Sequence, residues 1–415
     1  MSTFDRSIIK EEALKHHLRH RGEISIVSRV DIKDEHVLGL IYNPGAAPAC
    51  LAIHADPSQA INLTSKGNLV AVVSDGSAVL GLGNIGPEAA MPVMEGKALL
   101  FKAFAGIDAV PICLNTQDPD AIIATVKAIA PAFGGINLED ISAPRCFRIE
   151  TELKDLLDIP VFHDDQHGTA VVALAAVLNA LRVVDKEVDQ VRVVVSGTGA
   201  AAISVSRLLL RMGVEHLTMS DQWGLLYEGR TEGMDFAREE MATLTNRSRQ
   251  QGVLADALIG ADIFIGLSVA NLVTQEMIRS MAQDAICFPM ANPDPEISAE
   301  DAKAAGAAVV GTGRSDFPNQ INNVLAFPGI FRGALDVQAR RITEGMKIAA
   351  SKAIASLVPY AELRPDYILP KTRDLKVAPL VAAAVAKAAM DEGVARVNID
   401  PDLIAENTRR LIYED

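Results

Sequence analysis

The segment Val193-Val-Val-Ser-Gly-Thr-Gly-Ala-Ala-Ala202 decides the fold, because an apolar strand runs into a Gly-x-Gly-x-x-Ala turn that opens a helix. Gly197 permits the tight turn, and Gly199 lets the backbone approach a pyrophosphate. Ala202 stands where a small residue allows the helix to pack closely on the strand. The free N–H groups at the start of the helix favour phosphate. We therefore predict that this turn binds a dinucleotide through Gly197, Thr198, Gly199, Ala200, Ala201 and Ala202.

An acidic residue follows this turn at the distance expected for such a site. Asp221 ends the next predicted strand, 22 residues after Gly199 (221 − 199). An acid at this position binds the 2′-OH of the adenosine ribose in NAD, whereas NADP needs a cation near its 2′-phosphate. The next residues, Gln222-Trp223-Gly224, include no Lys or Arg, and the nearness of Arg230 in sequence does not establish that it is near Asp221 in space. The sequence therefore leaves the choice between NAD and NADP open.

Strands alternate with helices on both sides of this segment, which indicates an α/β protein with parallel sheets. A long apolar helix over 168–184 and a polar break at 185–190 separate two such units, so two domains are predicted at this length. We predict an N-terminal α/β domain over 1–165, a C-terminal Rossmann-like dinucleotide-binding domain over 166–390 and a C-terminal extension over 391–415. The strands are expected at 68–74, 109–114, 135–138, 159–162, 191–196, 216–221, 262–267, 285–290 and 308–311.

Composition narrows the class of protein. The chain has 415 residues and a formal charge of −14, with no Lys/Arg run, which argues against a nucleic-acid-binding protein. No apolar run of about 18 residues predicts a membrane span, and the N-terminus lacks a signal peptide. The four cysteines are scattered without metal-binding spacing, as in a reduced, cytoplasmic protein. We therefore expect a cytoplasmic protein that binds neither nucleic acid nor a membrane.

Two acidic pairs, Glu139-Asp140 and Asp164-Asp165, each follow an apolar run. Carboxylates that meet near apolar strands repel one another unless a positive charge lies among them. A hard divalent cation with oxygen ligands is the simplest candidate, so the pairs predict a Mg²⁺ or Mn²⁺ site. His163 and His167 flank the second pair and raise zinc as an alternative, but hydrogen-bonding or structural histidines are favoured beside carboxylates.

Two further side chains are candidates for proton transfer. Lys97 follows a glycine and precedes an apolar run, so we expect it at a helix start facing a cleft. There, burial would depress its pKa and make it a base, while the alternative is an ordinary surface lysine. Tyr42 precedes a Pro-Gly turn, where a loop tyrosine serves either as a proton donor or in packing.

These motifs together resemble those of malic enzymes of the short bacterial type, in the same order and over roughly residues 15 to 390. The segments that carry the resemblance are Tyr42–Gly45, Val72–Gly76, Gly81–Gly86, Pro92–Lys97, Asn137–Asp140, Phe162–Thr169, Ala291–Glu296 and Asn322–Gly329. The N-terminal unit would then be the malic domain of that family.

The resemblance implies oxidative decarboxylation of L-malate to pyruvate and CO₂ with reduction of NAD or NADP, in a homo-oligomer. It implies Lys97 as general base and Tyr42 as general acid, with Asp164 orienting Lys97. The implied metal ligands are Glu139, Asp140 and Asp165, and the residues implied to contact malate or the nicotinamide are Asn292 and Asn323.

The sequence departs from the family pattern at two places. Asn43 replaces a threonine after Tyr42, and Gln222-Trp223 replaces a Ser-Lys pair, which puts a preference for NADP in doubt. A malolactic enzyme or a plain 2-hydroxy-acid dehydrogenase is the second enzymatic hypothesis. A cofactor-binding sensor or scaffold would require a missing acid, base or ligand, and each of these positions is filled.

Overall fold

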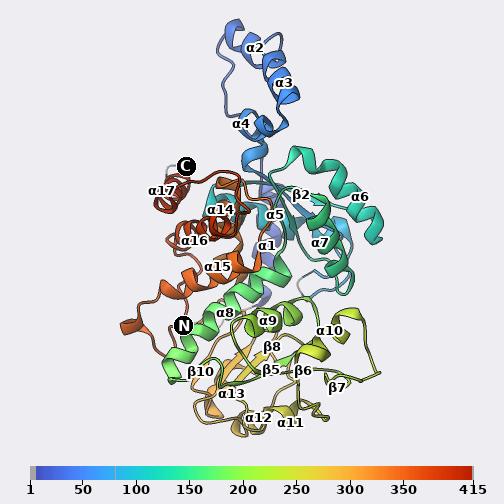
Figure 1. The fold of residues 1–415 in the computed structure, drawn as a ribbon, viewed down its shortest axis with the longest axis vertical. Helices are drawn as coiled ribbons and strands as arrows, with labels where there is room; N and C mark the ends of the chain where they lie inside the picture. The colour runs from blue at the N-terminus through green and yellow to red at the C-terminus, as the bar shows by residue number, and fades with distance from the viewer. Residues whose placement is uncertain (1–5, 80, 414–415) are drawn as a thin grey trace.

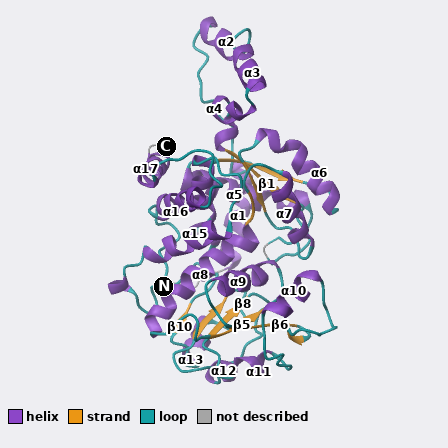
Figure 2. Ribbon diagram, viewed as in Figure 1, coloured by secondary structure: helices purple, strands orange, loops and turns teal. Residues whose placement is uncertain are grey.

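The computed structural model describes residues 6–79 and 81–413, and its strands form two separate sheets (Figures 1 and 2). The first sheet has four parallel strands in the order β2-β1-β3-β4. Its centre is β1, a run of β-branched and small residues that is buried from Val70 onward. The four strands predicted for this part of the chain are confirmed. They are β1 Leu69–Ser74, β2 Asp108–Cys113, β3 Gly135–Leu138 and β4 Val161–His163.

Three helices connect these strands. In the first of them, the buried residues Met94, Ala98, Phe101 and Ala105 recur at helical spacing and cover the sheet. Left-handed Gly106 ends that helix and turns the chain into β2. The connecting helices are α5 Pro87–Ala105, α6 Pro119–Ile129 and α7 Arg145–Leu156.

The second sheet has the order β10-β9-β8-β5-β6-β7, with only β7 antiparallel. Its five parallel strands were predicted, whereas the two-residue strand Gly224–Leu225 is too short to leave a periodic signal. The parallel strands are β5 Arg192–Ser196, β6 His216–Asp221, β8 Ile263–Gly266, β9 Ile286–Pro289 and β10 Val309–Val310. The accompanying helices are α9 Ala200–Arg211, α10 Phe236–Leu244, α11 Leu254–Leu258, α12 Gln275–Arg279 and α13 Ala299–Ala304. The chain is therefore an α/β protein with a Rossmann-like second unit.

Helix α8, Asp164–Val184, runs from the end of the first sheet to the second unit (Figure 1). It begins four residues before the predicted start at Gly168 (168 − 164), so Asp164 and Asp165 lie in its first turn. About two thirds of it, 67%, is buried. A helix apolar on all sides at this length is here a core helix of the protein.

The last four helices return to the first sheet: α14 Phe327–Asp336, α15 Glu344–Ser356, α16 Val377–Asp391 and α17 Pro401–Tyr413. Phe331 of α14 packs edge-to-face on Phe101 and Phe162, with ring centroids 5.2 and 5.7 Å apart. Helix α17 approaches α5 so closely that a Cβ on Gly106 would lie 2.6 Å from Cβ of Leu411. The body around the first sheet is therefore built from two distant parts of the sequence.

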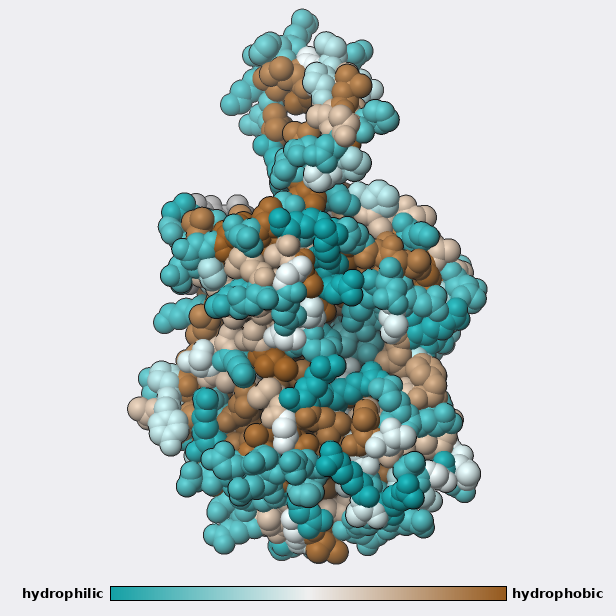
Figure 3. Space-filling model, viewed as in Figure 1, coloured by the Kyte–Doolittle hydropathy of each residue, from teal (hydrophilic) through white to brown (hydrophobic). Residues whose placement is uncertain are grey.

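The segment Glu35–Ala55, called the arm below, projects from this body (Figure 1). It consists of α2 Glu35–Ile41 and α3 Ala46–Ala55, and neither helix has a buried residue. The helices α1 Arg6–His20 and α4 Ala60–Leu63 flank it in sequence. The arm exposes apolar side chains, including those of Leu38, Leu40 and Leu51 (Figure 3). By length and composition alone, the arm and α8 each meet the requirements of a membrane span.

Candidate active site

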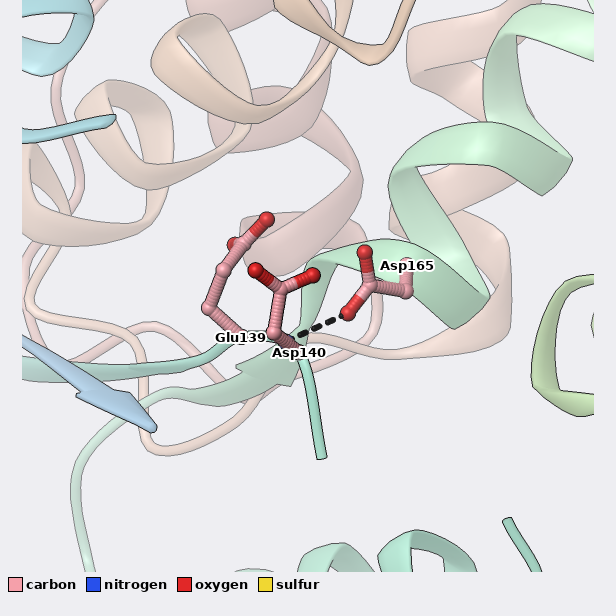
Figure 4. A group of neighbouring side chains, drawn as sticks. All are labelled: Glu139, Asp140 and Asp165. Atoms are coloured by element: carbon pink, nitrogen blue, oxygen red, sulfur yellow. Dashed lines mark hydrogen bonds between the residues drawn. The ribbon is translucent and has the colours of Figure 1, made fainter. Parts of the chain in front are cut away.

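Three carboxylates meet at the edge of the first sheet where its strands end (Figure 4). Glu139 and Asp140 directly follow β3, and Asp165 lies just beyond the neighbouring β4. Because β3 and β4 are parallel neighbours, their carboxyl ends place these side chains together. Their ligand atoms lie within 4.8 Å of one another, and the backbone N–H of Asp140 donates to Oδ2 of Asp165 at 2.8 Å.

This cluster suits a divalent cation. Within the described residues its members are all carboxylates, with no His or Cys, so its donors are the hard oxygens that Mg²⁺ and Mn²⁺ prefer. Glu139 and Asp140 are buried. Burial raises the pKa of Glu139, although Lys97 opposes this. A cation among the three oxygens would remove the cost of burying like charges.

Lys97 lies beside the cluster and is not a surface lysine, since only 7% of it is exposed. Its Nζ donates to Oδ2 of Asp164 at 2.6 Å and lies 3.0 Å from Oε1 of Glu139. The ring of Phe327 lies 4.3 Å from Nζ. The predicted position at a helix start is wrong: Lys97 lies in the interior of α5, where the buried face of the helix points it at the sheet edge.

The expected depression of the lysine pKa is also wrong. Burial alone lowers the pKa of Lys97, but the charges of Asp164 and Glu139 outweigh it and hold the pKa above its usual range. Burial raises the pKa of Asp164 to about 7, although Lys97 acts against this. The ionisation of this pair therefore depends on what else occupies the site.

A residue that follows the second sheet in the sequence also contacts Asp164. Asn323, just before α14, donates through Nδ2 to Oδ2 of Asp164 at 2.5 Å. Gly168 makes room for this contact, since a Cβ there would lie 1.9 Å from Oδ1 of Asp164 and 3.1 Å from Cβ of Asn323. The predicted residues Asp164, Lys97 and Asn323 are thus brought together.

Among the described residues, the two other predicted side chains, those of Asn292 and Tyr42, make no hydrogen bond to these carboxylates. Asn292 follows β9, and a Cβ added to Gly81, in the loop after β1, would lie 2.8 Å from its backbone oxygen. Asn292 therefore lies where the two units touch. Tyr42 ends α2 on the arm and is 77% exposed. The arm points away from the sheet edge, so Tyr42 is not brought to Lys97 within one chain (Figure 1).

The dinucleotide turn has the geometry that its sequence requires. Gly197 has φ of 115°, and a Cβ there would lie 2.3 Å from the carbonyl oxygen of Leu267. No atom lies within 4 Å of a Cβ on Gly199, which leaves the start of α9 open to a ligand. Ala202 is buried against the strand. The cofactor acid Asp221 is not a lone charge, because Arg230 donates two hydrogen bonds to it.

Sequence reasoning missed a second layer of polar residues behind the cluster. Asn137 donates to Oε2 of Glu139 at 2.9 Å. His167 is 2.8 Å from Oε2 of Glu150 through Nε2 and 2.9 Å from Nζ of Lys347 through Nδ1. This confirms His167 as a hydrogen-bonding histidine. Neither Glu150 nor Lys347 lies in a motif, and only the packing of α7, α8 and α15 brings them together.

Two family models match the chain. One described as the N-terminal domain of malic enzyme matches residues 20–154, and one described as the NAD-binding domain of malic enzyme matches residues 166–390. Glu139 and Asp140 lie within the first match, and the whole second sheet lies within the other.

Whole-chain relatives agree with these matches. The chain is 57% identical to the bifunctional malic/malolactic enzyme of Bacillus subtilis over 97% of this chain and 98% of that protein. It is 56% identical to the NAD-dependent malic enzyme of Geobacillus stearothermophilus over 90% of this chain and 78% of the relative. The crystal structure of malic enzyme from Pyrococcus horikoshii is similar with a TM-score of 0.93 and 47% identity, over 97% of this chain and 96% of that one. The chain belongs to the malic enzyme family.

Proposed function

We propose that the protein oxidatively decarboxylates L-malate to pyruvate and CO₂, reduces NAD⁺ or NADP⁺, and uses Mg²⁺ or Mn²⁺. The observation that supports this most strongly is the position of Lys97 between Asp164 and Glu139, beside the carboxylate cluster. A base, a set of oxygen ligands and a dinucleotide turn are the groups that this reaction needs.

Glu139, Asp140 and Asp165 would hold the cation, and the turn at 197–202 would hold the dinucleotide. A bound cation would supply Lewis acidity at the C2 oxygen of the substrate, and a bound nicotinamide would supply the hydride acceptor. Asn292 and Asn323 supply amide groups near the junction of the two units and would orient the carboxylates of malate.

Lys97 would take the proton from the C2 hydroxyl of malate. A base must be neutral before it accepts a proton, and the charges of Asp164 and Glu139 favour the charged form of Lys97. Positive charge bound by those same carboxylates would offset this preference. Asp164 would act as a positioning residue, because its hydrogen bonds from Lys97 and Asn323 fix the direction of the lysine.

Tyr42 would donate the proton to C3 of the decarboxylated product, which requires it to reach a site that its own chain does not bring near. We propose a homo-oligomer in which the arm of one copy lies against the site of another. Helices as short as α2 and α3 are marginal without packing, and the apolar side chains of the arm are exposed in one chain. A second copy would cover them.

We also propose a cytoplasmic location, with no nucleic-acid or membrane partner. The formal charge of −14 supports the first of these exclusions, because nucleic acid would be repelled.

A steady-state assay with L-malate, Mn²⁺ and either NAD⁺ or NADP⁺ tests the reaction, with the product identified by chromatography. Pyruvate formation with equimolar cofactor reduction is expected. Lactate without net cofactor reduction would instead support malolactic chemistry, for which the name of the Bacillus relative is the specific reason. Absence of pyruvate under every combination of cofactor and metal would refute the proposal.

A further inference from the structure

The carboxylate of Asp221 is already saturated with donors from the protein. Nη1 and Nη2 of Arg230 donate to Oδ1 and Oδ2 at 2.7 and 2.6 Å. The backbone N–H of Trp223 also donates to Oδ1 at 3.0 Å, and Oγ1 of Thr198 donates to Oδ2 at 3.3 Å. A carboxylate offers about four lone-pair sites, so these four contacts leave little capacity for a ribose 2′-OH. The acid is thus poorly suited to its usual role in NAD selection.

The negative charge of Asp221 is neutralised as well. Arg230 and Asp221 are both buried at their side chains and pair in the bidentate geometry of guanidinium and carboxylate. Selection against a 2′-phosphate relies on a lone negative charge near the ribose, and this charge is cancelled here. Sequence inspection finds no cation directly beside Asp221, because Arg230 reaches it only through the turn after β7.

A second guanidinium, that of Arg238, borders the same position. Its Nε donates to Oγ1 of Thr198 in the dinucleotide turn at 2.9 Å, and it lies 3.9 Å from Oδ2 of Asp221. Nη1 donates to Oδ2 of Asp235 and to the carbonyl oxygen of Gly233, each at 2.9 Å, which fixes the side chain in place. The adenosine ribose of a dinucleotide lies between the turn and the end of the second strand, and Arg238 contacts the groups on both sides.

Arg238 keeps capacity for a ligand. Its side chain is 26% exposed, and among the described residues its guanidinium donates through Nε and Nη1 but not through Nη2. Arg230, in contrast, is buried and committed to Asp221. The two guanidiniums therefore differ in role. That of Arg230 neutralises the charge of Asp221, and that of Arg238 is accessible to a ligand beside the expected position of the ribose.

We propose that this site is built for a 2′-phosphate, so that the enzyme selects NADP⁺ over NAD⁺ with Arg238 as the phosphate-binding residue. This rests on the proposed function only in that the dinucleotide is the oxidant of that reaction. A phosphate monoester carries close to two negative charges near neutral pH, and guanidinium is the side chain that best matches its geometry. Arg230 acts through Asp221 and is a positioning residue.

Titration calorimetry with adenosine 2′,5′-bisphosphate and with 5′-AMP tests the proposal without any turnover. The two ligands differ only in the 2′-phosphate, so the ratio of their dissociation constants isolates that group. We expect the bisphosphate to bind at least about tenfold more tightly, because a charge-assisted hydrogen bond is worth about that factor. Equal or tighter binding of 5′-AMP by the unmodified enzyme would overturn the proposal, even if malate turnover is normal.

Variants separate the phosphate contact from loss of structure. Arg238→Gln should lower the preference for the bisphosphate, which is the dissociation constant of 5′-AMP divided by that of the bisphosphate, about tenfold. Arg238→Lys should keep part of this preference because the charge is retained. Arg249→Gln is the matched control, since Arg249 lies in the same unit, is 62% exposed and pairs with Glu228. A ratio unchanged in Arg238→Gln would also overturn the proposal. In active enzyme, the ratio of kcat/KM for NADP⁺ over NAD⁺ should fall with the same variant.

Discussion

At the scale of single residues, burial lowers the pKa of Lys97, but the charges of Asp164 and Glu139 together outweigh it. The sequence predicts a base with a depressed pKa, but the pKa of Lys97 is raised, because oxygens of Asp164 and Glu139 lie within 3.0 Å of its Nζ. The residue type and its spacing in the motif identify Lys97 as a candidate. The direction of its pKa shift depends on partners 42 and 67 positions away (139 − 97 and 164 − 97), which no local pattern contains.

Replacement of Lys97 tests the assignment of the base. Lys97→Ala should lower kcat by about 10² to 10⁴, the usual contribution of a general base, while dinucleotide still binds. It should also destabilise the fold by several kcal/mol (about 3–5), because two buried carboxylates lose their cation. Steady-state kinetics and calorimetric binding of the cofactor measure the two effects. Lys102→Ala, five residues further along α5 (102 − 97), is the control, and unchanged turnover in Lys97→Ala would exclude Lys97 as the base.

Lys347 gives a prediction about pH. Burial lowers its pKa from 10.5 to about 8. Between these values the folded protein has released the proton while the unfolded chain still binds it, so the free energy of unfolding rises with pH in this window. Below pH 8 both states hold the proton and the contribution is constant.

Lys347→Met removes this titration. From pH 8 to 9.5 the free energy of unfolding of the unmodified protein should rise by about 1.5 kcal/mol relative to that of the variant. Guanidinium-induced unfolding of both proteins at the two pH values measures the difference. Parallel pH profiles for the two proteins would show that Lys347 has an ordinary pKa.

At the scale of elements, the start of α8 shows what periodicity misses. The apolar pattern of the helix begins at Gly168, but the helix itself begins at Asp164, so the acidic pair lies within the first turn. Acidic residues are favoured there by the helix dipole, and their polarity hides the helix start from a hydrophobic pattern. The interior strands and helices were predictable because their burial imposes periodicity, whereas the arm has no buried face to impose one.

Gly168 of α8 is predicted to be sensitive to the addition of a single methyl group. Gly168→Ala would press a methyl group onto Asp164 and Asn323, so kcat/KM for malate should fall tenfold or more while the fold loses about 1–3 kcal/mol. Gly96→Ala is the matched helical control, because no atom lies within 4 Å of a Cβ there, and it should stabilise the protein by up to about 1 kcal/mol. Kinetics and thermal denaturation separate the two, and normal activity in Gly168→Ala would contradict the close packing of Gly168 against Asp164.

At the scale of the whole molecule, the question is which copy supplies Tyr42. The sequence identified this tyrosine by its motif, but no sequence pattern reports that the arm carrying it leaves its own site. If the arm serves a second copy, a mixture of Tyr42→Phe and Lys97→Ala chains contains sites in which both residues are intact.

Co-expression of these two variants tests the arrangement. Each alone should be nearly inactive, while random pairing in dimers should restore roughly a quarter of the normal activity, since half of the dimers are mixed and one of their two sites is complete. Activity is measured on the co-purified protein, and analytical ultracentrifugation gives its mass. Leu51→Asp on the arm should lower that mass, whereas the equally apolar exposed site Ile259→Asp should not. A monomeric enzyme, or no recovery in the mixture, would rule out a shared site.

The return of α14 to α17 onto the first sheet has a consequence for how the protein is made. Residues emerge from the ribosome in order, so Phe101 and Phe162 cannot pack against Phe331 until most of the chain has been synthesised. The unit around the second sheet lies between these parts and can fold as soon as it emerges. Nascent chains halted near residue 320 should therefore contain a protease-resistant second unit and a protease-sensitive first one, the reverse of their order in the gene.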